Sequence, residues 1–297
     1  MHEPTPIHHA AQAARRWPDK LALICTPSGQ RCSELDAAAN QAAHALGQLG
    51  LAPGDGIAFC LPNGVAFAVL MLAALRTGLY YTPLPTKASA ADIAYICNDA
   101  GARLLVLDAA SGAHAELPAL LAPECPLIIS QADPTQPGAW EKLLAQQPAT
   151  TPTDPRPGIE MVYSSGSTGK PKGVRKALPV RNWTDADPRN AAIASAAHLG
   201  DDSVYLSTSP LYHSAPHRYL SASLNAGATV VVMERFDAQA SLECIDRYDC
   251  THSLWVPTMF HRLLKLDPSV RQRYRGERHR VAIHVAAPCP VPRKRAM

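Results

Sequence analysis

The 297-residue sequence has few aromatic side chains, 6% of the total, and no marked excess of charge of one sign. Its 28 basic and 25 acidic residues leave a formal net charge of +3, a balance too small to indicate a nucleic-acid partner. The 17 glycines show no three-residue period, which excludes a collagen-like chain. Since 47% of the residues are hydrophobic, the chain can still fill a packed core, and wholesale disorder is excluded as well.

No two of the eight cysteines have the two-residue spacing of a zinc knuckle or a redox dithiol, so we expect free thiols in a reducing compartment. The N-terminal residues lack the apolar core of a signal peptide. The longest apolar run, residues 65–75, is shorter than the about 20 residues that cross a bilayer. These absences predict a cytoplasmic protein without a membrane span.

Helix and strand signals alternate along the chain. In the first half we expect strands at 57–61, 79–84 and 102–107, and a second alternating block runs from 204 to 285. Such alternation is typical of βαβ units, so the sequence predicts an α/β fold with mainly parallel sheets.

Local signals mark the helix ends. Ser33 and Asp36 have the spacing of a capping box, in which the Asp36 carboxylate reaches back to the Ser33 amide, and Gly50 can end that helix in a left-handed turn. Asn63 and Ser89 are the N-caps that we expect for the next two helices.

A stretch rich in proline and threonine, residues 146–158, is typical of a linker. It predicts a first α/β subdomain over residues 1–145 and a second part over residues 159–297.

One segment, residues 161–174 (MVYSSGSTGKPKGV), carries the features of an anion-binding loop. It follows an expected strand at 159–163, and glycines at 166, 169 and 173 allow unusual backbone conformations and a close approach to a ligand. Lys172 adds positive charge among several hydroxyls, which suits a polyphosphate. The loop is not a Walker A motif, because Pro171 follows Lys170 where that motif has serine or threonine.

The segment 163–174 resembles the phosphate-loop signature of the adenylate-forming (AMP-binding) superfamily, which includes acyl- and aryl-CoA synthetases, luciferases and peptide-synthetase adenylation domains. The usual pattern is Tyr-Thr-Ser-Gly-Thr-Thr-Gly-x-Pro-Lys-Gly-Val, and serine at 164 and 167 keeps the hydroxyls. Further segments similar to the family's motifs follow in its order, at residues 33–35, 54–63, 78–84, 209–213, 227–232, 256–259 and 285–290.

This resemblance implies a layered αβαβα N-terminal domain with two mainly parallel sheets. It also implies an acid–thiol ligase of the acyl-CoA synthetase type: ATP and Mg²⁺ activate a carboxylic acid to an acyl-adenylate, and coenzyme A then displaces AMP. The catalytic residues implied are His213 and Lys172, and Thr168 is the residue implied for the metal. The nucleotide-binding residues implied are Ser164, Ser165, Gly166, Ser167, Thr168, Gly169, Lys170, Lys172, Ala286, Ala287 and Pro288.

His213 would lie near the acyl carbonyl and the α-phosphate, although a purely structural histidine is the alternative. We do not expect His213 and His217 to share a metal, because Pro216 is predicted to interrupt a helix between them. The stretch 210–222 contains no Asp, the residue with which amino-acid-activating relatives hold an amine. This favours an acid without an amine, of the fatty, aryl or steroid-like class.

The family's Tyr-Gly-x-Thr-Glu and Thr-Gly-Asp motifs and its small C-terminal domain with a catalytic lysine are not found in this sequence. We therefore expect a fragment, incomplete at its C-terminal end, or a chain whose missing part another chain supplies. Two alternatives stay open: a non-catalytic nucleotide-binding or interaction protein derived from the family, and an unrelated α/β binding module.

The 297-residue chain on its own is expected to form little or no acyl-adenylate, because those motifs hold magnesium, ribose and the catalytic lysine in the resembling family. ATP/pyrophosphate exchange with a panel of carboxylates measures this. Turnover near that of a complete enzyme would refute it.

Overall fold

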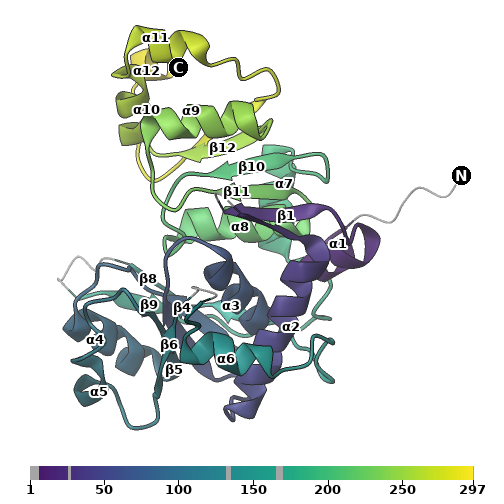
Figure 1. Ribbon diagram of the computed structural model, residues 1–297, viewed down its shortest axis with the longest axis vertical. Helices are drawn as coiled ribbons and strands as arrows, with labels where there is room; N and C mark the ends of the chain where they lie inside the picture. The colour runs from purple at the N-terminus through teal and green to yellow at the C-terminus, as the bar shows by residue number, and fades with distance from the viewer. Residues whose placement is uncertain (1–6, 26–27, 132–134, 165–169, 297) are drawn as a thin grey trace, which may run out of the picture. The chain divides into compact units, whose positions relative to one another are not determined.

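The computed structural model describes residues 7–25, 28–131, 135–164 and 170–296. The chain divides into two compact units: a central unit, Leu35–Asp185, and a terminal unit formed by Met1–Glu34 with Ala186–Met297 (Figure 1). These boundaries differ from the expected ones, which gave a first subdomain over residues 1–145 and a second part over residues 159–297. The predicted α/β class with two mainly parallel sheets is confirmed.

The central unit contains a five-stranded sheet in the order β6-β5-β3-β4-β7, in which all four neighbouring strand pairs are parallel. Its strands are β3 (Gly56–Cys60), β4 (Tyr80–Pro83), β5 (Ala102–Asp108), β6 (Leu127–Ser130) and β7 (Ile159–Glu160). Its helices are α2 (Cys32–Gln48, which starts in the terminal unit), α3 (Val65–Arg76), α4 (Ala90–Ala100), α5 (Leu117–Leu120) and α6 (Ala139–Ala145). All five residues of β3 are buried, as a central parallel strand requires.

The terminal unit contains a six-stranded sheet in the order β13-β12-β10-β11-β1-β2, parallel except for the β1–β2 hairpin (Figure 1). Its strands are β1 (Leu21–Cys25), β2 (Ser28–Arg31), β10 (Val204–Ser207), β11 (Thr229–Val232), β12 (His252–Trp255) and β13 (Val281–His284). Its helices are α1 (Ala10–Arg16), α7 (Pro188–Ala197), α8 (Ser214–Asn225), α9 (Ala238–Arg247), α10 (Pro257–Leu264), α11 (Pro268–Arg273) and α12 (Val291–Ala296). Because β1 pairs with β11, the N-terminal residues belong to this unit and not to a subdomain 1–145.

Residues 146–158, expected to be a linker, instead pack within the central unit. The carbonyl of Ala149 accepts from the side chain of Asn40 on α2 at 2.9 Å. Further along, the amides of Arg156 and Gly158 donate to the carbonyls of Arg76 and Leu75 at 3.1 Å each. Proline and threonine reduce helix formation here, but they leave carbonyl groups that neighbouring side chains and amides can satisfy.

Helix ends follow the local signals only in part. Ser89 caps α4 as predicted, with its hydroxyl accepting from the Asp92 amide at 3.1 Å. Gly50 adopts the predicted left-handed φ of 79°. The prediction for Asn63 is wrong, because Gly64 occupies the N-cap position of α3.

The predicted capping box between Ser33 and Asp36 is also wrong. At this helix start the Arg31 amide donates to Glu34 Oε2 at 2.7 Å. The Asp36 carboxylate is engaged elsewhere, in an ion pair of 3.0 Å with Arg76.

The eight cysteines are free thiols. None of the helices in the described ranges is both long and apolar enough to traverse a bilayer.

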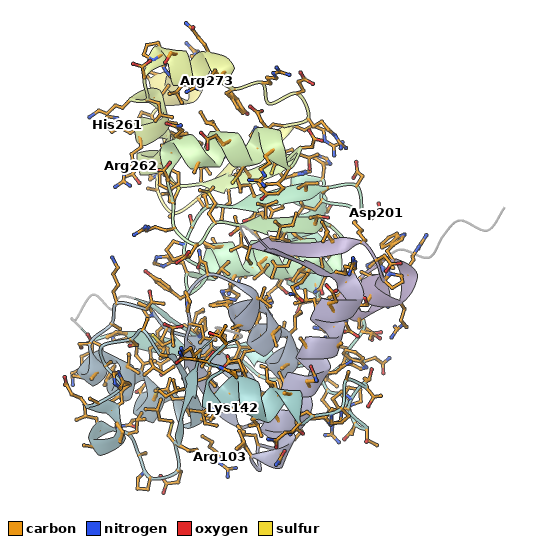
Figure 2. The ribbon with its side chains drawn as sticks, in the orientation of Figure 1. Arg103, Lys142, Asp201, His261, Arg262 and Arg273 are labelled. Carbon is orange, nitrogen blue, oxygen red and sulfur yellow. The ribbon has the colours of Figure 1, made fainter. Side chains whose placement is uncertain are left out.

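Arg76 connects α3 to α2 in the core of the central unit, where its side chain is only 1% exposed. Besides Asp36, it contacts the side-chain oxygen of Asn40 and lies over the Trp183 ring at 5.6 Å. An exposed pair in the same unit, Arg103 with Asp55 at 2.8 Å, provides a comparison; Figure 2 labels Arg103.

Arg76→Met is expected to lower the free energy of unfolding by about 3 kcal/mol, since it leaves the Asp36 carboxylate without its partner. The control Arg103→Gln is expected to cost less than about 1 kcal/mol, because exposed pairs contribute little. Urea unfolding of both variants measures the difference. Equal losses would contradict the structural role assigned to Arg76.

Candidate functional site

The segment predicted to bind phosphate starts and ends in a two-stranded hairpin of the central unit. β8 (Val162–Ser164) pairs antiparallel with β9 (Lys172–Val174), so that Tyr163 faces Gly173 and Ser164 faces Lys172 along the backbone. The expected single strand 159–163 is therefore divided between β7, which belongs to the five-stranded sheet, and β8, which belongs to the two-stranded sheet. Five of the predicted site residues lie outside the described residues: Ser165, Gly166, Ser167, Thr168 and Gly169.

The two lysines of the segment have different surroundings. Lys172 begins β9 and its side chain is exposed. Lys170 places its ammonium 5.2 Å from the centre of the Tyr95 ring on α4, within the range of a cation–π contact. Both lysines are exposed, and of the two Lys170 has its ammonium over the ring of Tyr95 on α4.

Tyr163 forms a hydrogen bond with α4, the helix that carries Tyr95. Its hydroxyl donates to Asp99 Oδ2 at 2.6 Å, the short distance typical of a hydrogen bond to a carboxylate. Burial, assisted by the hydrogen bond and the charge of Asp99, raises the pKa of Tyr163 above its ordinary value. The phenol therefore stays a donor throughout the physiological pH range.

Gly173 does not have the unusual backbone conformation predicted for it, but it leaves room for neighbouring side chains. Its φ is not left-handed, but a Cβ atom at this position would lie 2.7 Å from Tyr163 Cζ and 2.7 Å from Met161 Cε. The glycine thus leaves room for the Tyr163 ring across the hairpin.

The chain just after β9 is also held. Arg175 lies 4.2 Å from the centre of the Tyr80 ring and donates to the Gly54 carbonyl at 3.1 Å. The Tyr80 hydroxyl donates to the Lys176 carbonyl at 2.7 Å. Both sides of the segment are therefore fixed within the central unit.

His213 belongs to the terminal unit, where it is the N-cap residue of α8. The Tyr212 ring lies 4.3 Å from the His213 ring, centre to centre. Burial lowers the pKa of His213, so that its imidazole is mainly neutral near pH 7.

Pro216 does not interrupt the helix, contrary to the prediction. It lies in the first turn of α8, where a helix makes no use of the missing N–H, and His217 follows in the same helix. Within the described ranges, no group of three or more His, Cys, Asp or Glu side chains is arranged to hold a metal ion.

The segment predicted to border an adenine follows β13 in the terminal unit. The Val285 amide donates to the Trp255 carbonyl at 3.0 Å and extends the sheet by one bond. Ala286 then adopts a φ of 72°, a left-handed conformation that costs a residue with a Cβ about 1–2 kcal/mol. Ala287 and Pro288 follow as exposed residues.

The predicted site residues thus fall in both units: the loop residues in the central unit, and His213 with residues 286–288 in the terminal unit. A cavity of about 400 Å³ in the terminal unit includes none of them; Trp17, Asn190 and Asp201 are among its lining residues. The sequence analysis missed Tyr95 and Asp99. The sequence does place Tyr95 and Asp99 on one face of an expected helix, because residues four apart on a helix share a face.

A family profile described as AMP-binding enzyme matches residues 10–297. The chain is 32% identical over 265 residues to salicyl-AMP ligase / salicyl-S-ArCP synthetase of Mycobacterium tuberculosis, covering 84% of this chain and 46% of that protein. It is 31% identical over 294 residues to 3-[(3aS,4S,7aS)-7a-methyl-1,5-dioxo-octahydro-1H-inden-4-yl]propanoyl:CoA ligase of the same organism, covering 93% and 56%. The chain spans about half the length of the curated relatives it matches.

Among solved structures, the inhibitor-bound N-terminal domain of FACL13 from M. tuberculosis has a similar fold, with a TM-score of 0.80 and 23% identity. The similarity covers 97% of this chain and 71% of that one.

Ala286→Gly is expected to raise the free energy of unfolding by about 0.5–1 kcal/mol, because glycine adopts the left-handed φ without a Cβ penalty. Ala287→Gly is the matched control, since its φ is not positive, and it is expected to be neutral or destabilising. Thermal unfolding compares the two. An Ala286→Gly variant less stable than the parent would contradict the backbone strain assigned here.

Proposed function

The chain belongs to the AMP-binding enzyme family, and on that basis we propose that it takes part in the ATP-dependent activation of a carboxylic acid to an acyl-adenylate. Coenzyme A is the proposed thiol that then displaces AMP, which makes the whole protein an AMP-forming acid–thiol ligase. We further propose the cytoplasm as the site of this reaction.

The observation that carries the proposal is the antiparallel pairing of Ser164 with Lys172 at the two ends of the glycine- and hydroxyl-rich segment. This pairing brings together the described residues on the two sides of the segment. The exposed side chain of Lys172 lies at one of these two ends, in the sequence context of a phosphate-binding loop.

The chemistry explains why such a loop is required. A carboxylate is a poor electrophile, because its charge is delocalised and oxide is a bad leaving group. Attack of the acid on the α-phosphate of ATP forms the adenylate and releases pyrophosphate, on which negative charge accumulates. Donors held around the departing group stabilise that charge more in the transition state than in the ground state.

For the site, we propose that Ser164 and Lys172 bind the β- and γ-phosphates together with residues 165–169. His213, neutral near pH 7, is proposed to donate a hydrogen bond to the acyl-adenylate. Ala286, Ala287 and Pro288 are proposed to border the adenine.

Magnesium is proposed only as the companion of the ATP phosphates. Magnesium at such sites is held mainly by phosphate oxygens and water, with one or two protein oxygens, so the lack of a three-residue cluster among the described residues is compatible with it. Thr168, the residue predicted to face it, lies outside the described residues. When bound, the ion would offset charge on the phosphates.

For the acid, we propose a molecule without an amine: fatty, aryl or steroid-like. The curated relatives named above are a salicyl ligase and a ligase for a bicyclic propanoyl acid. The absence of Asp between 210 and 222 agrees with this class.

Nucleotide binding tests the proposal on the 297-residue chain. ATP with Mg²⁺ is expected to raise the melting temperature, because a ligand at 100 times its Kd stabilises by about 2.7 kcal/mol. Lys172→Gln removes a charged donor and is expected to weaken ATP binding about tenfold or more. Lys142→Gln, an exposed lysine on α6 that Figure 2 labels, is the matched control and is expected to bind ATP as the parent does.

A folded chain that ATP does not stabilise would refute the proposal and favour an unrelated α/β module. The acid is tested in the same assay. In the presence of ATP, fatty, aryl or steroid-like acids are expected to raise the melting temperature further. A chain that binds ATP but no acid is the non-catalytic relative instead.

A further inference from the structure

One face of α4 contacts both ends of the nucleotide-binding segment. Tyr95 and Asp99 lie four residues apart on this helix, and they therefore project from the same side. We propose that these two residues are positioning residues for ATP: they hold Tyr163 and Pro171, on the two sides of the segment proposed to bind the β- and γ-phosphates, without contacting the nucleotide. This inference rests on the function proposed above.

Asp99 holds the entry to the segment. The Tyr163 hydroxyl donates to its carboxylate at 2.6 Å, one residue before Ser164. Gly173, the backbone partner of Tyr163, provides the space in which the tyrosine ring lies. The contact therefore fixes the register of β8 on β9, and with it the direction in which the chain enters the loop.

Tyr95 holds the exit. Its hydroxyl donates to the Pro171 carbonyl at 3.2 Å, and its ring lies 5.2 Å from the Lys170 ammonium. Pro171 has no N–H of its own, so its carbonyl is the backbone group through which this residue can be tied down. Tyr95 thus directs Lys170 towards α4, while Lys172, two residues on, begins β9 with its side chain exposed.

The helix that carries both residues is itself well anchored. Ser89 caps its first turn, and its apolar residues Ile93, Ala94 and Cys97 are buried in the core. Asn98 binds the segment around α5, donating to the Leu120 carbonyl at 3.1 Å and accepting from the Ala122 amide at 3.0 Å. A rigid support of this kind lowers the ordering cost of binding, because the loop ends are already in place.

The test compares ATP with AMP, because AMP lacks the β- and γ-phosphates. In the 297-residue chain, Tyr95→Phe removes the hydroxyl and keeps the ring beneath Lys170, and we expect ATP binding to weaken about threefold. Asp99→Ala removes a charged acceptor, and we expect about a tenfold loss. Both variants are expected to bind AMP as the parent chain does. Isothermal calorimetry measures the dissociation constants.

Two further variants separate positioning from general stability. Asp99→Asn keeps an oxygen that can accept from Tyr163, and it is expected to recover most of the ATP affinity lost in Asp99→Ala. Asn98→Ala is the matched control on the same helix: it removes contacts to α5 and none to the hairpin. This control is expected to lower the melting temperature and to leave the ratio of ATP to AMP affinity unchanged.

The outcomes are distinct. Unchanged ATP binding in Tyr95→Phe and Asp99→Ala overturns the inference and leaves the proposed function intact. Equal losses of ATP and AMP affinity also overturn it, since they indicate general destabilisation. A parent chain that binds no ATP refutes the proposed function, and this inference with it.

Discussion

The segment proposed to bind phosphate is rich in glycine, serine and threonine, so it offers few large side chains for packing. Its support therefore depends on the described residues at its two ends. In this chain the β8–β9 pairing brings those ends together, and α4 holds them through Tyr95 and Asp99. Tyr80 holds the chain that follows. The central unit can thus be understood as a sheet and a helix that support one hairpin.

The sequence predicted those parts of the fold that depend on local signals. Ser89 and Gly50 mark helix ends, and apolar runs mark the parallel strands, because caps, turns and burial are encoded within a few residues. It did not predict that β1 joins β11, more than 200 positions away in the chain, since strand pairing is set by tertiary structure. Residues 146–158 were predicted wrongly for the same reason: their composition is that of a linker, but the Ala149 carbonyl accepts from α2, and the amides of Arg156 and Gly158 donate to carbonyls of α3.

The sequence indicated a phosphate-binding segment, which stays a prediction, but it did not indicate which residues hold the two ends of that segment. Lys172 and the hydroxyl-rich segment form a sequence motif that is recognisable without a structure. Tyr95 lies in an amphipathic helix whose sequence gives no sign of a contact with Pro171, and only the fold shows that contact. Gly173 lacks the unusual backbone conformation predicted for it and instead makes room for the Tyr163 ring, which no local pattern indicates. Ala286 adopts a left-handed backbone conformation, although nothing in the sequence around it indicates one.

Hydrogen–deuterium exchange of the 297-residue chain, with ATP and with AMP, tests the central claim most directly. The account predicts that ATP slows exchange in peptides covering residues 161–176 and in those covering α4, and that AMP has little effect on either. Protection by ATP confined to other parts of the chain, or equal protection by AMP, would contradict it.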